Sequence, residues 1–431
     1  MTMPCYPQGC AAKLQSVCTG LAATTQQGWG CKPCPPMRAM PTTPATSLNN
    51  GKVDKNRNRH RRQVQTALRA GQWQPGRTGV VTHPKTREIH APAFADRVVH
   101  HLLVERLEPL YEPVFIHDSF ANRRGKGSHA AVDRLQAFMR ARANRVQGGG
   151  WSLQLDIHNC FNSIHRPTLY AMLCARLALA ERRQQLLPSH ALALRSLCHK
   201  LLVCRSPEWV RDPQARVPPH KRLCNAAPGC GLPVGNLTSQ FFANVYLNAL
   251  DQFVKHTLKA RHYVRYVDDF VLLADTRQQL EQWQARITGF LRHTLHPQLK
   301  VGAHLQPCVN GLDFLGYVVF AQRHRVRRRV VSHCRARLAL WYRQHRKAVS
   351  SRRLLPADFA QLQALLGSYW GHFAHANSVR LRRKLFAQRA WLGELFAMAD
   401  DGRLWPAAPA QWVVRRHCVV RQILKPEGEV A

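Results

Sequence analysis

Residues 263–273 constrain the fold of this chain more than any other stretch. They read Tyr-Val-Arg-Tyr-Val-Asp-Asp-Phe-Val-Leu-Leu, which is an apolar run, two adjacent carboxylates and a second apolar run. Apolar runs around a short polar break predict a strand, a tight turn and a second strand. At a separation of about 4 Å and an effective dielectric constant of about 20, the carboxylates of Asp268 and Asp269 would repel each other by roughly 4 kcal/mol. A bound divalent cation would offset this repulsion, and the alternative is a solvated turn that carries two acids.

A second acidic stretch lies upstream, at residues 151–164. Its first residues, Trp-Ser-Leu-Gln-Leu-Asp, alternate in the manner of a strand with one buried face, and Asp156 stands near the end of that strand. In-line displacement at phosphorus uses two cations about 3.5–4 Å apart, which require several convergent carboxylates. One aspartate at a strand end and two on an adjacent hairpin can supply such a set. One cation would then activate the attacking hydroxyl, and the other would hold the phosphates and the leaving pyrophosphate.

The charge of the chain indicates a polyanionic partner. Its 431 residues carry 63 Lys and Arg against 24 Asp and Glu, a formal net charge of +39. Such an excess favours nucleic acid first and an acidic membrane surface second. We find no signal peptide and no run of about 18 uncharged apolar residues, so no transmembrane helix is expected. The 14 cysteines form no regular framework, which favours a reducing cytosol, and Cys31 and Cys34 have zinc-ligand spacing without a second pair at a suitable spacing.

Further segments have recognisable local patterns. Residues 119–128, Ser-Phe-Ala-Asn-Arg-Arg-Gly-Lys-Gly-Ser, form a loop whose glycines permit close backbone approach and whose cations suit a triphosphate. A Gly-Pro-Gly loop at 231–235 leads into a long helix predicted over 238–258, and residues 311–320 suit another tight hairpin. Beyond residue 320 the sequence is helix-compatible and very basic.

In their order, these motifs resemble those of the reverse transcriptase family, over about residues 75–400. The correspondence places Lys85 and Arg87 in the first finger motif, residues 119–127 in the second, residues 156–164 in the first acidic motif of the palm, residues 231–240 in the loop under the base pair, residues 266–269 in the Tyr-x-Asp-Asp box and residues 312–317 in the primer grip. The resemblance implies an α+β right-hand polymerase fold, with fingers and palm built on an antiparallel sheet and a helical thumb. The implied division of the chain is a disordered extension at 1–50, fingers and palm at 51–320, a basic thumb at 321–405 and a tail at 406–431.

The resemblance also implies roles for single residues. The catalytic ligands of two Mg²⁺ ions would be Asp156, Asp268 and Asp269. The carbonyl of Ile157 would assist them, and Asp269 would be the less direct ligand. Contacts with the nucleotide or the template are implied for Lys85, Arg87, Arg123, Lys126, Phe161, Val234, Gly235, Asn236 and Gln240. The ring of Phe161 would exclude a ribose 2′-hydroxyl, with an ordinary core position as the alternative. Lys300 would be the general acid for pyrophosphate, or it is an ordinary surface lysine.

The stretch Gly-Asn-Leu-Thr-Ser-Gln-Phe-Phe-Ala-Asn at 235–244 resembles the reverse transcriptases of diversity-generating retroelements. Many other reverse transcriptases have Gln where this chain has Val234, and in the retroelement enzymes an apolar residue there is associated with miscopying of template adenines. The expected function is therefore error-prone copying of a template RNA into cDNA from dNTPs, in the cytoplasm and from a bacterial or phage gene. The resemblance also implies a small accessory protein partner. The alternatives are a retron or phage-defence reverse transcriptase and a catalytically silent RNA-binding protein with the same fold.

Overall fold

The structure is a computed structural model that describes residues 63–68, 70, 72–75, 78–81, 88–203 and 217–407. Outside these ranges lie the predicted extension at 1–50 with Cys31 and Cys34, the predicted finger residues Lys85 and Arg87, and nearly all of the predicted tail at 406–431. The chain divides into two compact units. Of the described residues, the first unit contains those up to Gly127, those within Leu153–Leu272, and Gln278–His304, and the second contains Ser128–Ser152, Leu273–Arg277 and those from Leu305 to Ala407.

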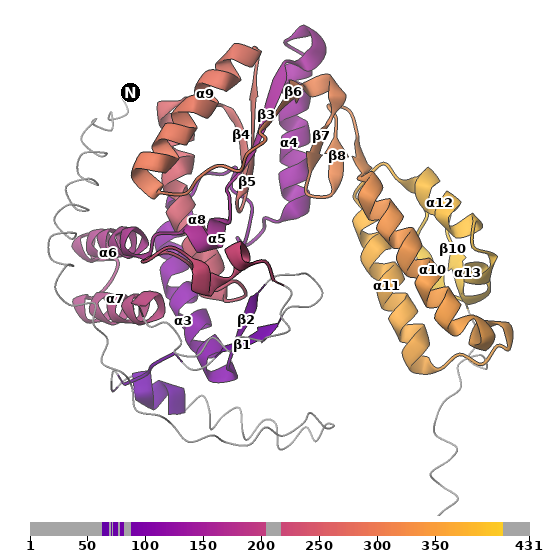
Figure 1. Ribbon diagram of the computed structural model, residues 1–431, viewed down its shortest axis with the longest axis horizontal. Helices are drawn as coiled ribbons and strands as arrows, with labels where there is room; N and C mark the ends of the chain where they lie inside the picture. The colour runs from indigo at the N-terminus through magenta and orange to yellow at the C-terminus, as the bar shows by residue number, and fades with distance from the viewer. Residues whose placement is uncertain are drawn as a thin grey trace, which may run out of the picture. The chain divides into compact units, whose positions relative to one another are not determined.

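The first unit is mainly helical (Figure 1). Its helices are α3 (Phe94–Tyr111), α5 (Cys160–Ser163), α6 (Arg166–Arg182), α7 (Pro188–Val203), α8 (Leu237–Gln252) and α9 (Arg277–Phe290). Short 3₁₀ or π turns supplement them at η1 (Glu112–Val114), η3 (Pro219–Lys221), η4 (Leu223–Asn225), η5 (Phe253–Thr257) and η6 (Leu291–Leu295). The strands β1 (Thr78–Val81) and β2 (Ile89–Pro92) form an antiparallel ribbon, with Val81 opposite Ile89.

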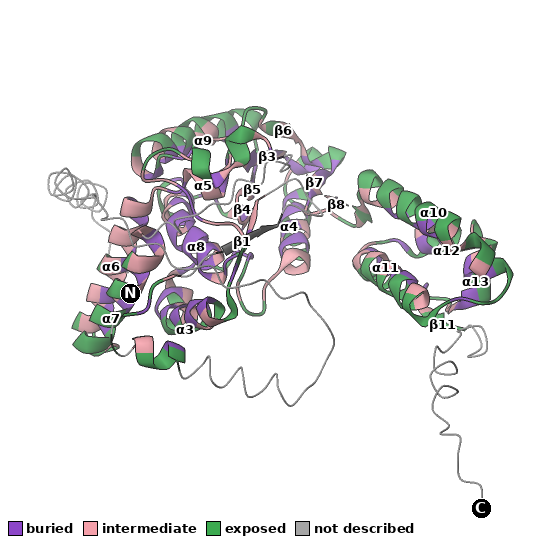
Figure 2. Ribbon diagram, turned by 60° about the horizontal axis from the view of Figure 1, so that its bottom comes forward, coloured by how far each residue is buried: buried purple, intermediate pink, exposed green. Residues whose placement is uncertain are grey.

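Helix α8 is the buried centre of the first unit. Figure 2 shows α8 mostly in the colour of buried residues. Its sequence is apolar around most of its circumference, and Phe242, Tyr246 and Leu250 are at most 1% exposed. Helices α3 and α6 pack against it. A helix that is apolar on nearly all sides is stable in the core of a large protein, where neighbours cover each face. The helix predicted over 238–258 is confirmed, and its last residues form the π turn η5.

A four-stranded sheet contains both acidic motifs. Its strands lie in the order β4 (His262–Tyr266), β5 (Asp269–Ala274), β3 (Trp151–Asp156) and β6 (His304–Pro307). Val267 and Asp268 alone join β4 to β5, which confirms the tight hairpin predicted at 263–273. All residues of β5 after Asp269 are buried, so the second apolar run of the hairpin belongs to the core. The sheet therefore brings the end of β3 beside the start of β5.

The second unit combines small antiparallel sheets with a group of helices. Its helices are α4 (Ser128–Ala143), α10 (Arg328–Ser350), α11 (Pro356–Ala374), α12 (Val379–Ala387) and α13 (Ala390–Leu395), with 3₁₀ turns η2 (Gln147–Gly149) and η7 (Cys308–Asn310). Its strands are β7 (Leu312–Phe314), β8 (Tyr317–Val319) and β9 (His324–Val326) in one sheet, and β10 (Phe396–Met398) and β11 (Leu404–Pro406) in another. The hairpin predicted at 311–320 is confirmed, because Leu315 and Gly316 make a two-residue turn with φ of 51° and 92°, as a type I′ turn requires.

Helix α10 shows how the basic sequence after residue 320 folds. Its buried residues Cys334, Leu338 and Trp341 recur at helical spacing and join an apolar core with α11, α12 and α13. The remaining surface carries exposed cations: Arg328, Arg329, Arg335, Arg337, Arg343, Arg346 and Lys347. Among the described residues, no helix is both long and apolar enough to cross a membrane.

Candidate active site

The structure places the three predicted aspartates at the ends of neighbouring strands of one sheet. Asp156 is the last residue of β3, Asp268 lies in the turn between β4 and β5, and Asp269 is the first residue of β5. The amide of Ile157 donates a hydrogen bond of 3.2 Å to the carbonyl of Asp268, so the backbone after Asp156 directly contacts the turn. All three aspartates are partly exposed, which leaves their oxygens open to solvent and ligands.

Two further side chains hold these carboxylates. The Lys300 ammonium lies 3.5 Å from Asp156 Oδ2, and its backbone amide donates to the Asp156 carbonyl at 2.8 Å. Both side chains of this ion pair are well exposed, at 62% and 42%, so we expect it to contribute no more than about 1 kcal/mol. The Gln154 amide donates to both oxygens of Asp269, at 2.9 and 3.2 Å. Sequence reasoning missed Gln154, although its position two residues before Asp156 on a strand places both on one face.

A buried thiol follows Asp156 by four residues in the chain. Cys160, at the start of α5, is 3% exposed. Burial raises the pKa of its thiol, and the nearby carboxylates of Asp268 and Asp156 raise it further. Cys160 is therefore neutral at physiological pH.

The chemistry of the donors fits a hard divalent cation. Carboxylate and carbonyl oxygens from Asp156, Ile157 and Asp268 are the ligand type that Mg²⁺ prefers. Within the described ranges, no group of three or more His, Cys, Asp or Glu side chains is arranged to hold a metal ion. Mg²⁺ commonly binds through one or two carboxylates and takes its other ligands from water and substrate phosphates, so this donor set is of the expected size.

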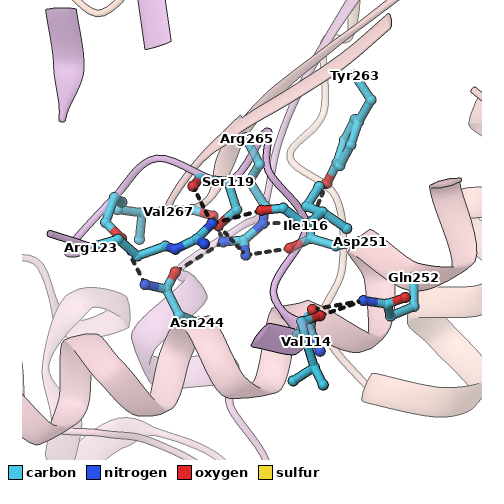
Figure 3. A network of polar contacts seen from close by, with 12 residues as sticks. Val114, Ile116, Ser119, Arg123, Asn244, Asp251, Gln252, Tyr263, Arg265 and Val267 are labelled. Carbon is cyan, nitrogen blue, oxygen red and sulfur yellow. Dashed lines mark hydrogen bonds and ion pairs between the residues drawn. The ribbon is translucent and has the colours of Figure 1, made fainter. Parts of the chain in front are cut away.

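Behind the turn lies a fully buried ion pair (Figure 3). The guanidinium of Arg265, on β4, donates to both carboxylate oxygens of Asp251, on α8, at 2.7 and 2.6 Å. Burial acts to lower the pKa of Arg265, but the charge and hydrogen bonds of Asp251 outweigh it, so the pKa is raised and the arginine stays charged. Arg265 also donates to the carbonyl of Val267, inside the turn, at 3.0 Å. Sequence reasoning did not single out either member of this pair.

The predicted cations Arg123 and Lys126 are engaged with their own loop. Arg123 donates to both carboxylate oxygens of Glu112 and to the carbonyls of Ile116 and Ser119, and its side chain is 6% exposed. Lys126 donates to the carbonyl of His117 at 2.7 Å. In this structure both cations hold the loop in shape, and their contact with a nucleotide stays a prediction.

The loop before α8 is pinned to the β1–β2 ribbon. The amide of His90, on β2, donates to the Val234 carbonyl at 2.6 Å. Gly235 has a φ of 115°, and a Cβ on it would lie 2.6 Å from the His90 carbonyl, so only glycine fits this close approach. Asn236 is buried immediately before α8, and its backbone carbonyl accepts a hydrogen bond of 3.3 Å from the backbone amide of Gln240.

Phe161 belongs to the acidic motif at 156–164 and connects it to this loop through the backbone. It lies on α5, is partly exposed, and its carbonyl accepts a hydrogen bond of 2.8 Å from the amide of Leu232. A partly exposed ring differs from an ordinary core position, but the role of Phe161 as a filter for the sugar stays a prediction. Lys85 and Arg87 are outside the described residues, so the structure does not place them.

Residues 81–317 match the reverse transcriptase (RNA-dependent DNA polymerase) family. Because this match spans more than half of the chain, the protein belongs to the reverse transcriptase family. The family assignment confirms the predicted right-hand polymerase fold of mixed helices and antiparallel sheet, and it places the chain among RNA-directed DNA polymerases.

Two relatives and one solved structure are similar to this chain over different shares of its length. Protein YkfC of Escherichia coli K12 is 24% identical over 295 residues, which cover 60% of this chain and 70% of YkfC. The group II intron-encoded protein LtrA of Lactococcus lactis is 26% identical over 171 residues, 39% of this chain and 23% of LtrA. Telomerase from Candida albicans, solved with a TWJ fragment of telomeric RNA, aligns with a TM-score of 0.41 and 12% identity, covering 74% of this chain and 55% of the telomerase.

Proposed function

We propose that this protein copies a template RNA into cDNA by two-metal nucleotidyl transfer from dNTPs. The observation that carries the proposal is the hydrogen bond from the Ile157 amide to the Asp268 carbonyl, which joins the two acidic motifs in a chain of the reverse transcriptase family. This bond brings the strand that ends in Asp156 to the turn that holds Asp268. A shared cation site needs this arrangement.

Asp156 and Asp268 would hold two Mg²⁺ ions, with the Ile157 carbonyl assisting and Asp269 as the less direct ligand. When bound, the ions would supply activation of the primer hydroxyl and charge neutralisation at the triphosphate. Gln154 supports the lesser role of Asp269, because its amide already occupies both oxygens of that carboxylate. The chain itself positions these oxygens through the β3 strand end and the β4–β5 turn.

Lys300 is the proposed general acid for the leaving pyrophosphate. Its ammonium lies 3.5 Å from Asp156 in this structure, and a cation at Asp156 would weaken that ion pair and free the ammonium. The proton would move from Lys300 Nζ to a pyrophosphate oxygen as the bond to phosphorus breaks. If Lys300 is an ordinary surface lysine, its replacement will leave the rate of nucleotide addition unchanged.

The nucleotide site would be completed by residues from three segments. Phe161 would exclude a 2′-hydroxyl, and the pinned loop before α8 would lie under the new base pair. The further contacts that we propose are Lys85, Arg87, Arg123, Lys126, Val234, Gly235, Asn236 and Gln240. We also propose fingers and palm at 51–320 and a thumb at 321–405 whose arginines hold the template–primer backbone.

We further propose an error-prone enzyme of a diversity-generating retroelement. Support comes from Val234, which has no side-chain amide to hydrogen-bond near the incoming nucleotide, and from the stretch at 235–244. The partners would be a template RNA, its cDNA and a small accessory protein. A template repeat and a variable gene beside the coding sequence would support this subfamily, whereas an effector or toxin gene would favour a retron or defence system.

Primer extension on an RNA template tests the activity. We expect Mg²⁺-dependent extension by the wild-type chain and none by Asp268→Asn, which keeps the size of the side chain but removes its charge. Glu105→Gln is the matched control, because Glu105 is exposed on α3 and far from the acidic motifs in the sequence. Extension by Asp268→Asn at the wild-type rate would refute the assigned site, and RNA binding without extension by the wild type would favour a silent RNA-binding protein.

A further inference from the structure

Arg265 directly precedes the Tyr-Val-Asp-Asp turn, and its guanidinium is completely buried. Figure 3 shows this group at the centre of a polar network between α8, β4 and the loop after η1. A buried charge of this kind is costly unless its donors all find acceptors. Nε, Nη1 and Nη2 of Arg265 all have acceptors.

One side of the guanidinium is anchored to α8. Asp251 accepts from Nε and Nη2, and it also accepts a hydrogen bond of 2.8 Å from the Tyr263 hydroxyl. About two turns earlier on the same helix, Asn244 Oδ1 accepts from Nη1 at 3.3 Å. Because most residues of α8 are buried, these acceptors fix the guanidinium to a helix in the core of its unit.

The other side of Arg265 holds the catalytic turn. Nη1 donates to the carbonyl of Val267, whose φ is 57°. This left-handed conformation is unfavourable for a β-branched residue and persists only where the surroundings enforce it. The peptide that carries this carbonyl leads directly into Asp268. The hydrogen bond from Arg265 therefore fixes the orientation of the peptide between Val267 and Asp268, and with it the direction of the Asp268 side chain.

Arg265 also ties the neighbouring loop to the same strand. Its Nη2 donates to Ser119 Oγ at 3.2 Å, its amide donates to the Asp118 carbonyl at 2.9 Å, and its carbonyl accepts from the Phe120 amide at 3.0 Å. The segment that begins the predicted triphosphate loop is thus held at the edge of β4. The five N–H groups of the planar guanidinium serve its acceptors on Asp251, Asn244, Val267 and Ser119 at once, which the three of a lysine ammonium cannot.

We propose that Arg265, anchored by Asp251, is a positioning residue that orients Asp268 toward the metal. The inference rests on the proposed function, in which Asp268 is a metal ligand. Partners that orient a metal ligand typically change metal affinity or activity by roughly 10- to 100-fold when they are replaced. A purely structural ion pair would change stability and leave the metal affinity of the folded protein as it was.

Mn²⁺ binding, followed by electron paramagnetic resonance, separates these roles without relying on catalysis. The variants are Arg265→Lys, which keeps the charge but not the fork, and Tyr263→Phe, which removes one bond to Asp251 and no bond of Arg265. Each is measured below its own unfolding transition. We expect Arg265→Lys to bind Mn²⁺ roughly 10- to 100-fold more weakly and to need correspondingly more Mg²⁺ for primer extension, while Tyr263→Phe behaves as the wild type.

Val267→Pro tests the same link from the turn. Proline cannot adopt a positive φ, so it displaces the Val267 carbonyl while the buried pair stays intact. We expect it to weaken Mn²⁺ binding as Arg265→Lys does, and the double variant to be no worse than either single variant. If Arg265→Lys does not fold, Val267→Pro alone tests whether the orientation of the Val267 carbonyl controls Mn²⁺ binding.

Wild-type Mn²⁺ affinity in Arg265→Lys or Val267→Pro, or an equal loss in Tyr263→Phe, would overturn the inference. Asp268→Ala separates this result from a failure of the proposed function. If Asp268→Ala binds Mn²⁺ like the wild type, Asp268 is not a metal ligand and both proposals fail. If Asp268→Ala loses Mn²⁺ while Arg265→Lys retains it, the proposed function stands and the positioning role alone is wrong.

Discussion

Gln154 and Asp156 stand two residues apart on β3, so their side chains share one face of the sheet. Gln154 uses its amide to hold Asp269 by both oxygens. We expect Gln154→Leu to lower the rate of primer extension by roughly tenfold, because Asp269 would then be free to turn away from the site. Gln282→Leu, on the exposed side of α9, is the matched control. Steady-state rates decide the point, and equal rates for both variants would remove Gln154 from the site.

The buried pair of Arg265 and Asp251 predicts a large effect on stability. Asp251→Ala would leave the guanidinium buried without its counter-charge, which typically costs about 3–5 kcal/mol in the free energy of unfolding. Tyr263→Phe removes a single hydrogen bond to Asp251 and should cost roughly 0.5–1.5 kcal/mol. Urea denaturation of both variants measures the difference. Similar values for the two would mean that Arg265 finds another acceptor.

Val234 carries the prediction on fidelity. Val234→Gln would restore a side-chain amide where the loop before α8 is pinned to β2. We expect it to reduce misincorporation opposite template adenines, because the amide would add a geometric constraint on the incoming nucleotide. Sequencing of cDNA made from one defined RNA measures this. An unchanged error spectrum would show that the residue at 234 does not control fidelity.

At the scale of elements, the contact between α3 and α8 predicts a dependence of stability on pH. His100 shares a hydrogen bond of 2.7 Å with Thr238, and burial lowers its pKa from 6.5 to about 4, with a smaller effect from His101. Between these two values the unfolded chain binds more protons than the folded one. The contribution of His100 is thus fully present above about pH 6.5 and is lost as the pH falls toward about 4.

We expect His100→Gln to flatten this part of the curve of unfolding free energy against pH, and His190→Gln, exposed on α7, to leave it unchanged. Some slope should remain, because burial lowers the pKa of His90 to about 4 as well. Urea denaturation between pH 4 and 7 measures the curves. Parallel curves for the wild type and His100→Gln would contradict the assignment.

The elements that sequence predicts best are those set by local pattern. The hairpin at 263–273 and the helix at 238–258 follow from apolar period and turn composition, which depend on neighbours in the chain. Local pattern does not predict the partners of Asp251 and Gln154. The pairs Arg265–Asp251 and Gln154–Asp269 form only when separate elements pack together. Arg265 reads as one more cation in a chain with 63 of them. The sequence likewise shows the charge of Arg123, but it does not show that Glu112 accepts hydrogen bonds from this guanidinium.

At the scale of the whole molecule, the net charge of +39 predicts strong salt dependence of RNA binding. Each phosphate that the protein neutralises contributes about −0.9 to the slope of log affinity against log salt on a duplex. Replacing the exposed α10 residues Arg335, Arg337, Arg343 and Arg346 with Gln should make this slope shallower by up to about 3–4. A double Gln variant of Arg182 and Arg183, exposed near the end of α6, is the control. Equal slopes for both would place the nucleic acid away from α10.

Metal rescue tests most directly whether Asp268 binds the cation that catalyses nucleotide addition. Asp268→Cys replaces a hard oxygen ligand with a thiolate, which disfavours Mg²⁺ and accepts softer cations. Primer extension on an RNA template is compared in Mg²⁺, Mn²⁺ and Cd²⁺ for this variant and the wild type. We predict that Asp268→Cys is inactive in Mg²⁺ and regains extension in a softer cation that also supports the wild type. Extension by Asp268→Cys in Mg²⁺ at the wild-type rate would contradict the metal site at the centre of the proposed function.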